Sequence, residues 1–201
     1  MQFFIYGKKE LSHLQAKDER LSQAIERIGL IQREVTPDLF EALIHSIVGQ
    51  QIAAKAHKTV WSRMKAELKI ITPCSIEAVN EDELQSFGIS FRKANYIKNA
   101  AHMVSSGAID LDRLSSLSDE EVCAKLTCLK GVGVWTAEML MLFSMQRPNI
   151  ISYGDYAIRK GICMLYGYEQ LDKKLFDKHK NNYAPYASTA SLYLWAIAGG
   201  A

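Results

Sequence analysis

Apolar residues recur at a spacing of three or four along almost the whole chain, and this pattern predicts a fold built from helices. The clearest stripe runs from Phe40 to Val48, and a second occupies residues 8–29, which can form one helix or two short ones. Further helices are expected at about 52–68, 75–79, 81–86, 91–105, 118–127, 135–145, 156–166, 172–181 and 187–198. No segment alternates with period two for long enough to predict a sheet. We therefore predict an all-α fold with two helical lobes and a cleft between them.

Several expected helices have recognisable ends. Thr36-Pro37-Asp38 is typical of a helix start, with proline in the first turn and an acid near the positive end of the helix dipole. Ser118 followed by Glu121 matches a capping box. Gly131-Val132-Gly133 is a tight turn between two helical patterns. These signals divide the chain into short helices with brief connections.

Composition excludes several classes of protein. No run of about 18 apolar residues occurs, so we expect no membrane-spanning helix. The four cysteines, at positions 74, 123, 128 and 163, have no CxxC spacing and are expected to be reduced thiols, not a disulfide framework or a zinc site. The five histidines lack metal-ligand spacing as well. A folded soluble protein with reduced, cytosolic thiols fits these limits.

The net charge of +2 is too small to indicate nucleic-acid binding by itself, but the charges are unevenly placed. Between Gln51 and Lys69 there are five cations and one acid, whereas residues 77–83 carry four acids and no base. Such asymmetry can draw a polyanion to one face of a protein, although an ordinary solvated helix gives the same pattern. The sequence leaves both interpretations open.

The turn at residues 131–133 and Asp155 suggest a site. A Gly-x-Gly turn brings backbone N–H groups close to whatever lies at the start of the next helix, which favours an anion. Asp155 lies 20 residues beyond Trp135, at the expected start of another helix. An aspartate there can be a simple helix cap, and a lone Gly-x-Gly can be a simple packing loop. Together they are consistent with a clamp on a DNA phosphate beside one catalytic carboxylate.

Three landmarks in order resemble a known family. The segment LKGVGVWTA (residues 129–137), followed by Asp155, is similar to the helix-hairpin-helix and aspartate of the helix-hairpin-helix–GPD superfamily of DNA glycosylases. LIHSIVGQQIAA (residues 43–54) resembles the family's segment with Gly-Gln-Gln, and Tyr183-Ala184-Pro185-Tyr186 followed by Trp195 resembles the ending of its alkylpurine branch. The resemblance covers residues 36–199 and is greatest to the 3-methyladenine DNA glycosylase II type.

This resemblance implies a single glycosylase domain over residues 1–201. The hairpin would span about 122–146, one lobe about 36–150, and the other lobe residues 1–35 with 151–201. The implied activity is hydrolysis of the N-glycosidic bond of alkylated purines, such as 3-methyladenine and 7-methylguanine, flipped out of duplex DNA. A glycosylase for a different base lesion and a catalytically silent module that binds damaged or branched DNA are the alternatives.

The resemblance also implies roles for individual residues. Asp155 would stabilise the oxocarbenium-like transition state and direct the attacking water. The base pocket would be formed by aromatic side chains, although such residues are core by default: Trp135, Trp195, Tyr153 and Tyr183. The DNA contacts would come from Lys130, Gly131, Val132, Gly133 and Thr136 of the hairpin and from Gln50 and Gln51, of which Gln51 would fill the gap left by the flipped nucleotide.

Some family features are replaced or missing. Members that cut the DNA strand have a lysine nucleophile where this chain has Trp135, so we predict base removal without lyase chemistry. No cysteine follows Cys163, so the family's iron–sulfur cluster is not expected. An arginine is common in the family at the position of Ala187, and an acid at that of Gly154, so the pocket can differ in shape.

The expected partners follow from the same resemblance. The substrate would be double-stranded DNA with alkylated bases, and the protein is expected to act as a monomer without a membrane. Related hairpins hold Na⁺ or K⁺ on loop carbonyls, which would here be those of Thr127, Leu129 and Val132; no other cofactor is expected. The location would be the cytoplasm in a bacterium and the nucleus in a eukaryote.

Overall fold

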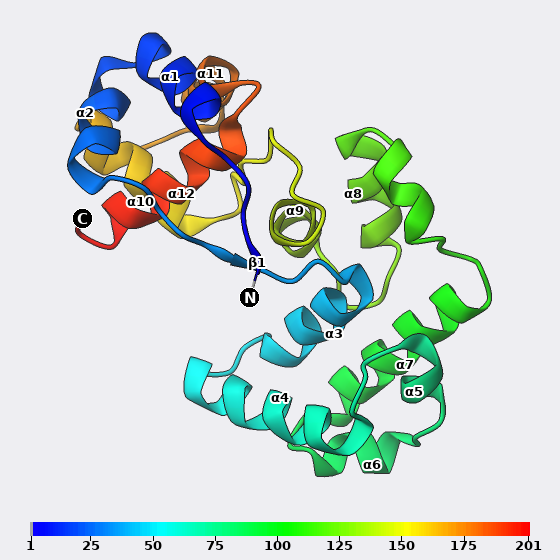
Figure 1. Cartoon of the computed structure of the whole chain (residues 1–201). Helices are drawn as coiled ribbons and strands as arrows, with labels where there is room; N and C mark the ends of the chain where they lie inside the picture. Colours follow the sequence, from blue (N-terminus) through cyan, green and yellow to red (C-terminus); the bar gives the residue numbers. More distant parts are fainter. Residues whose placement is uncertain (1) are drawn as a thin grey trace. The chain divides into compact units, whose positions relative to one another are not determined.

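The computed structural model describes residues 2–201, and over this range the regular secondary structure is almost wholly helical (Figure 1). The elements in order are β1 (Gln2–Phe3), α1 (Lys8–Lys17), α2 (Glu19–Ile28), β2 (Glu34–Val35), α3 (Leu39–Gly49), α4 (Ala54–Leu68), α5 (Pro73–Glu77), α6 (Glu81–Ser86), α7 (Phe91–Ser105), the 3-10 helix η1 (Asp112–Ser116), α8 (Asp119–Thr127), α9 (Val134–Phe143), α10 (Tyr156–Tyr166), α11 (Lys173–Tyr183) and α12 (Ala187–Ala198). The all-α prediction is confirmed. The described strands, β1 and β2, form one antiparallel pair two residues long, which is too short to leave an alternating pattern in the sequence.

The predicted helix signals are confirmed in part. Asp38 caps α3 as an acid at its start, but Pro37 lies before the helix and not in its first turn. Ser118 Oγ accepts a hydrogen bond from the N–H of Glu121 at 3.2 Å, and Glu121 Oε2 accepts one from the N–H of Ser118 at 2.8 Å. This reciprocal pair is the capping box that begins α8. Asp18 separates α1 from α2 and caps α2, so the apolar stripe of residues 8–29 is divided into two helices. Short helices therefore follow from local capping as well as from the apolar pattern.

The chain forms two compact units. One is continuous, Thr36–Leu140, and the other combines the N-terminal residues up to Val35 with Met141–Ala201. The division after Leu140 lies earlier than the boundary at residue 150 that we predicted. Residues 141–150 belong to the discontinuous unit because Ser188 of α12 accepts a hydrogen bond from the N–H of Ile150 at 2.8 Å and donates one to the carbonyl of Arg147.

The core of the discontinuous unit is formed where α10 and α12 pack together, with α2 against both. Leu14, Leu21, Ile158, Ile162 and Leu194 are fully buried there. Each lies on the apolar face of its helix, so the pairing follows from the helical spacing of these residues. This packing fixes the start of α10, where Asp155 lies.

The core of the continuous unit is organised around α3 and α7. Leu43, Ile44, Ile47 and Val48 of α3 are fully buried, and α7 packs against α3, α5 and α6. The apolar stripe predicted from Phe40 to Val48 is therefore a core face. In the described part of the chain, no helix is both long and apolar enough to cross a membrane.

Candidate active site and DNA interface

Asp155 is the N-cap residue of α10. Its backbone is extended (φ −82°, ψ 113°), and its Oδ1 accepts a hydrogen bond from the N–H of Ile158 at 3.0 Å. The side chain is 9% exposed. A second donor, Nε1 of Trp195, lies 3.3 Å from the same Oδ1. The carboxylate is thus a helix cap, as the simpler interpretation held, and it is also fixed by a side chain from a different helix.

Trp195 belongs to an aromatic stack on the discontinuous unit. Its ring stacks on Phe143 with centroids 5.5 Å apart and an interplanar angle of 28°. The guanidinium of Arg33 lies 4.8 Å from the centroid of Phe143, at a cation–π distance. The sequence predicted a site role for Trp195 but not for Phe143 or Arg33. Phe143 is an apolar residue in an apolar helix and Arg33 lies outside the helices, so no sequence pattern marks either as part of a site. The stack holds the indole that donates to Asp155.

Gly161 allows α10 and α12 to approach this closely. A Cβ atom at Gly161 would lie 2.2 Å from the carbonyl oxygen of Leu194 and 3.1 Å from its Cα. Real Cβ atoms do not make such contacts with backbone, so the position requires glycine. Leu194 precedes Trp195, so the close crossing places the indole beside Asp155. Sequence reasoning did not identify this role of Gly161.

Buried serines of α12 hold the connector that leads to Asp155. In addition to the contacts of Ser188 with Arg147 and Ile150, the N–H of Ser188 donates to the carbonyl of Pro148 at 3.0 Å, and Ser191 Oγ donates to the carbonyl of Ile150 at 3.2 Å. Both serines are fully buried. The extended segment between α9 and α10 therefore has its backbone groups paired with side chains, which buried backbone requires.

Besides Trp195, two more of the four predicted pocket aromatics, Tyr153 and Tyr183, lie in this unit. Tyr153 is half-buried, packs edge-to-face on Phe176 at 5.1 Å, and has Arg159 and Lys173 at 5.2 and 5.4 Å from its ring centroid. Tyr183 is fully buried, and its hydroxyl lies 2.8 Å from that of Tyr166. Burial raises the pKa of Tyr183 above its usual range. A ring with no exposed face cannot stack on a base, so Tyr183 is a core residue and the pocket prediction for it is wrong.

Ala187 and Gly154 are the two departures from the family pattern. Ala187 is fully buried at the first position of α12, and its N–H donates to Oδ1 of Asn149 at 3.4 Å. Gly154 is exposed, directly before Asp155. The alanine is part of the packing of α12, whereas the glycine leaves the surface next to the carboxylate without a side chain.

In the continuous unit, the predicted hairpin connects α8 to α9. Gly131 has φ +80°, and a Cβ there would lie 2.2 Å from Cδ2 of Tyr96. Gly133 is different, because its φ is not in the left-handed region and a Cβ there would meet no atom within 4 Å. The fold therefore requires glycine at 131 but not at 133. A glycine in open space leaves its backbone accessible to a molecule outside the chain.

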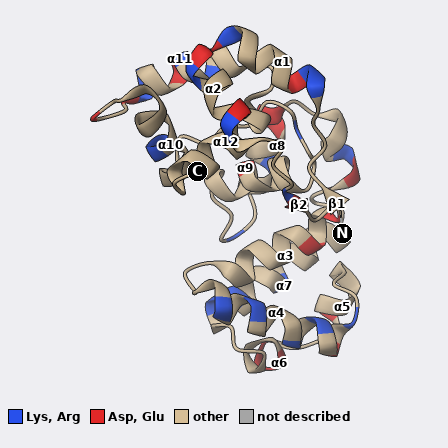
Figure 2. Cartoon of the chain, turned by 60° about the vertical axis from the view of Figure 1, so that its left-hand side comes forward, with Lys and Arg blue, Asp and Glu red and all other residues tan. Residues whose placement is uncertain are grey.

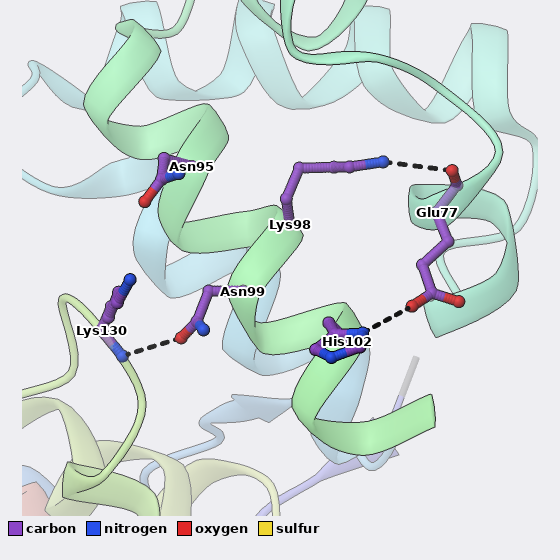
Figure 3. Close-up of a pocket in the computed structure, with 6 residues that line it drawn as sticks. All are labelled: Glu77, Asn95, Lys98, Asn99, His102 and Lys130. Atoms are coloured by element: carbon purple, nitrogen blue, oxygen red, sulfur yellow. Dashed lines mark hydrogen bonds and ion pairs between the residues drawn. The ribbon is translucent and has the colours of Figure 1, made fainter. Parts of the chain in front are cut away.

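The turn itself is closed by local hydrogen bonds. The N–H of Val132 donates to the carbonyl of Leu129 at 3.1 Å, and Val132 is buried. The exposed Lys130 is anchored by its backbone N–H, which donates to Oδ1 of Asn99 at 3.4 Å (Figure 3). The side chain of Lys130 lines a surface hollow of about 450 Å³ with Asn95, Asn99 and other residues of α7. The lysine is thus placed on the surface beside the turn.

The first turn of α9 exposes large apolar side chains. Val134 and Trp135 are 59% and 48% exposed. Thr136 is 7% exposed, so its side chain is not available for the DNA contact predicted for it, and only its backbone could make one. The N–H groups in the first turn of a helix have no acceptor within the helix, which makes this end suited to an anion. A tryptophan that is part of the core would be largely buried, so Trp135, with its exposed ring beside this helix end, is not a core residue.

The turn after α3 holds the two predicted glutamines in different ways. Nε2 of Gln50 donates to the carbonyl of Gly131 at 2.8 Å, so Gln50 ties this turn to the hairpin. Gln51 is exposed and has φ +55°, a conformation that residues other than glycine rarely adopt. Nη2 of Arg92 lies 3.5 Å from Oε1 of Gln51. Gln50 has a structural role, and Gln51 is the side chain that projects into solvent.

A buried lysine, which the sequence analysis missed, supports this turn. Nζ of Lys93 donates to the carbonyls of Val48 and Gln50 at 2.8 and 2.5 Å. The side chain is 9% exposed, and its burial, with a smaller effect of the Arg92 cation, lowers the pKa of Lys93. A cation at the carboxyl end of α3 complements the helix dipole. Lys93 therefore fixes the backbone that carries Gln51.

A histidine pair lies under the same turn. The rings of His45 and His57 are 4.2 Å apart, and a Cβ at Gly49 would lie 2.7 Å from Cε1 of His57. Burial lowers the pKa of His45 to about 4, and His57 contributes further. Burial also lowers the pKa of His57. Both rings are therefore neutral at pH 7. Among the described residues, no group of three or more His, Cys, Asp or Glu side chains is placed to hold a metal ion.

The chain is similar to known DNA repair proteins in sequence and in structure. The sequence model of the HhH-GPD superfamily of base excision DNA repair proteins matches residues 44–185. The chain is 30% identical to DNA-3-methyladenine glycosylase 1 of Schizosaccharomyces pombe over 191 residues, which cover 91% of this chain and 84% of the relative. It matches a crystal structure of DNA-3-methyladenine glycosidase from Bacillus halodurans with a TM-score of 0.90 and 37% identity over 100% of this chain and 94% of that one. It also matches the S. pombe 3-methyladenine DNA glycosylase in complex with abasic DNA, with a TM-score of 0.81 and 30% identity over 94% of this chain and 95% of that one.

Proposed function

The chain belongs to the HhH-GPD superfamily of base excision DNA repair proteins and is a DNA N-glycosylase, and we propose that it removes alkylated purines, such as 3-methyladenine and 7-methylguanine, from duplex DNA. The observation that carries this proposal is the carboxylate of Asp155. It is held at the start of α10 by the N–H of Ile158 and by Nε1 of Trp195.

The proposed reaction is hydrolysis of the N-glycosidic bond. The bond between C1′ of the deoxyribose and the base nitrogen breaks, and its electron pair leaves with the base. Positive charge develops on the sugar, and the fixed carboxylate of Asp155 stabilises it. Water then bonds to C1′, and Asp155 accepts the proton that this water loses. An alkylated purine already carries positive charge and departs as a neutral base, so the reaction has little need of a strong general acid.

Aromatic faces suit a cationic leaving base. Trp135, through its exposed ring, and Trp195 are each proposed to offer an aromatic face to the flipped purine. Because the hairpin helix has Trp135 where a strand-cutting relative would have a lysine, no amine is available there to form a Schiff base. The enzyme is therefore proposed to be monofunctional, leaving an intact abasic strand.

DNA would be held by the hairpin and by the turn after α3. The open surface at Gly133 supports a contact of backbone N–H groups with a phosphate, with Lys130 adding charge. Gln51, exposed and strained, is proposed to fill the gap in the duplex. A monovalent cation would fit the carbonyls of Thr127, Leu129 and Val132: the carbonyl of Leu129 closes the turn with one lone pair and keeps a second.

The test is the release of free base from methylated duplex DNA by the wild type and by Asp155→Asn. Asparagine is also a good N-cap, so this variant should keep the start of α10 while it loses the charge. We expect the wild type to release 3-methyladenine and the variant to fail, with strands breaking only after alkali.

Three other results would contradict parts of this proposal. Strand cleavage by the wild type without alkali would refute the monofunctional mechanism. Release of a different base alone would move the substrate to another lesion. If both proteins bind DNA and neither releases a base, Asp155 is only a helix cap and the chain is a silent binding module.

A further inference from the structure

We propose that the exposed face of α4 binds the sugar–phosphate backbone of DNA that flanks the flipped nucleotide, and this inference rests on the proposed function. The basic segment noted in the sequence corresponds to this helix and its C-terminal end. In Figure 2, Lys and Arg lie along α4 in the continuous unit. Residues 54–69 contain five cations and one acid, whereas the rest of that unit, residues 36–53 and 70–140, contains six cations and twelve acids. The positive charge of this unit is therefore concentrated on one helix.

The helix turns these cations toward solvent. Val60 and Met64 face the core and are 7% and 0% exposed. The opposite side of α4 carries Lys55 and Lys58, and Arg63 lies on a flank of the helix near Gly88. These three cations are exposed, as is Lys69 just after the end of the helix. Lys65 lies between the two sides and is paired with Glu41 at 2.8 Å, so its charge is locally balanced. The exposed cations have their charge available to a polyanion.

Small side chains share the same face. Thr59, Ser62 and Ala66 follow Lys55 along it at helical spacing, and all three are exposed. Such small side chains let a backbone approach the helix surface closely, while the longer Lys55 and Lys58 can reach phosphates. A helix of 15 residues is about 22 Å long, which is enough to follow several phosphates of one strand. Shape and charge on this face both favour a nucleic-acid backbone.

The position of α4 in the chain points to the same partner. The helix begins three residues after Gln51, the side chain proposed to enter the duplex, and the intervening residues Ile52 and Ala53 are exposed. The face is therefore continuous with the surface that would contact DNA at the lesion. On this placement α4 contacts the duplex beyond the lesion without reading bases, so it contributes to the binding of undamaged DNA as well.

The test is the salt dependence of binding to an undamaged duplex, measured for the wild type and for Lys55→Gln/Lys58→Gln. A cation that neutralises a phosphate contributes about 0.9 to the slope of log K against log salt concentration. The double variant should therefore lose roughly 1.8 of that slope and bind more weakly at low salt. Its rate of base release at saturating enzyme should equal that of the wild type, because these lysines do not touch the reacting atoms.

A matched control removes the same charge elsewhere. Lys174→Gln/Lys178→Gln changes two exposed lysines of α11, in the other unit, and should leave the slope unchanged. If both double variants have the wild-type slope, or both lose it equally, the inference is refuted, while base release by the wild type still decides the proposed function independently. A large loss of base release by the α4 variant at saturation would also refute it, since it would place α4 in the chemical step.

Discussion

Gly161→Ala tests whether the crossing of α10 and α12 is what positions the active site. In an open helix this change stabilises a protein by about 1 kcal/mol, because alanine is the better helix former. Here the new Cβ would lie 2.2 Å from the carbonyl oxygen of Leu194. An ordinary contact of carbon with a carbonyl oxygen is about 3.3–3.6 Å, so the helices would have to separate by about 1 Å.

The expected loss of stability follows from this displacement. Overpacking a core costs about 1–3 kcal/mol, and contact with backbone favours the upper end of that range. After the gain in helix propensity is subtracted, a net loss of about 2 kcal/mol remains. For a chain of this size that corresponds to a fall of roughly 4–8 °C in the unfolding temperature.

The rate of base release should fall by more than the loss of folded protein alone would cause. Asp155 lies at the start of α10, so separation of α10 from α12 would displace the carboxylate itself as well as weaken its contact with Trp195. A displacement of about 1 Å at a catalytic group can reduce a rate by about 100-fold. The assays are thermal unfolding by circular dichroism and base release at saturating enzyme. Gly133→Ala is the matched control for the unfolding measurement, because a Cβ there meets nothing within 4 Å. If Gly161→Ala unfolds at or above the wild-type temperature, the reasoning about the crossing is wrong.

Three further predictions concern the hairpin, the indole and the histidine pair. Gly131→Ala should lower the unfolding temperature by several degrees, since φ +80° and the neighbouring tyrosine ring exclude a side chain. Gly133→Ala should instead unfold at the wild-type temperature and bind DNA more weakly; equal unfolding temperatures of the two variants would contradict this. Trp195→Phe keeps an aromatic ring but loses the donor to Asp155. A hydrogen bond to a charged group contributes about 1.5–3 kcal/mol, and this one is long, so base release should slow roughly tenfold. An unchanged single-turnover rate would show that the contact does not contribute to the reaction. Burial lowers the pKa of His45 from 6.5 to about 4, so the contribution of its neutral form to stability should be fully present above pH 6.5 and be lost as the pH falls toward 4. In urea unfolding at several pH values, His45→Gln should lose less stability than the wild type over this range, and an identical dependence of the unfolding free energy on pH would exclude the histidine as the cause.

The resemblance to the glycosylase family was visible in local sequence because local backbone geometry requires particular residues. Gly131 has to adopt a positive φ, Ser118 and Glu121 cap each other within one turn, and Asp155 caps the helix that follows it. Each requirement involves residues only a few positions apart, so it leaves a pattern that can be recognised in sequence. The same patterns gave most helix boundaries, and the resemblance added Asp155 as the proposed catalytic carboxylate.

The partners of these residues come from distant parts of the chain. Trp195 is 40 residues from Asp155, and no spacing rule connects them. Lys93 is a charged residue in a helix, and sequence alone does not indicate that its ammonium is buried against the carbonyls of Val48 and Gln50. Tyr183 matched a family landmark, yet packing placed its ring fully inside the core. Residue type was therefore a poor guide to the burial of these side chains.

The sequence by itself determined which segments are helical, where most of them begin and end, and which carboxylate lies at the start of α10. Those properties depend on interactions across one or two turns of chain. Only the tertiary structure decided that Gly161 lets α12 approach α10, that Trp195 then donates to Asp155, and that Lys55 and Lys58 share an exposed face of α4. These depend on which helices pack together, because burial and contact are set by the summed packing of distant residues and not by the identity of any one of them.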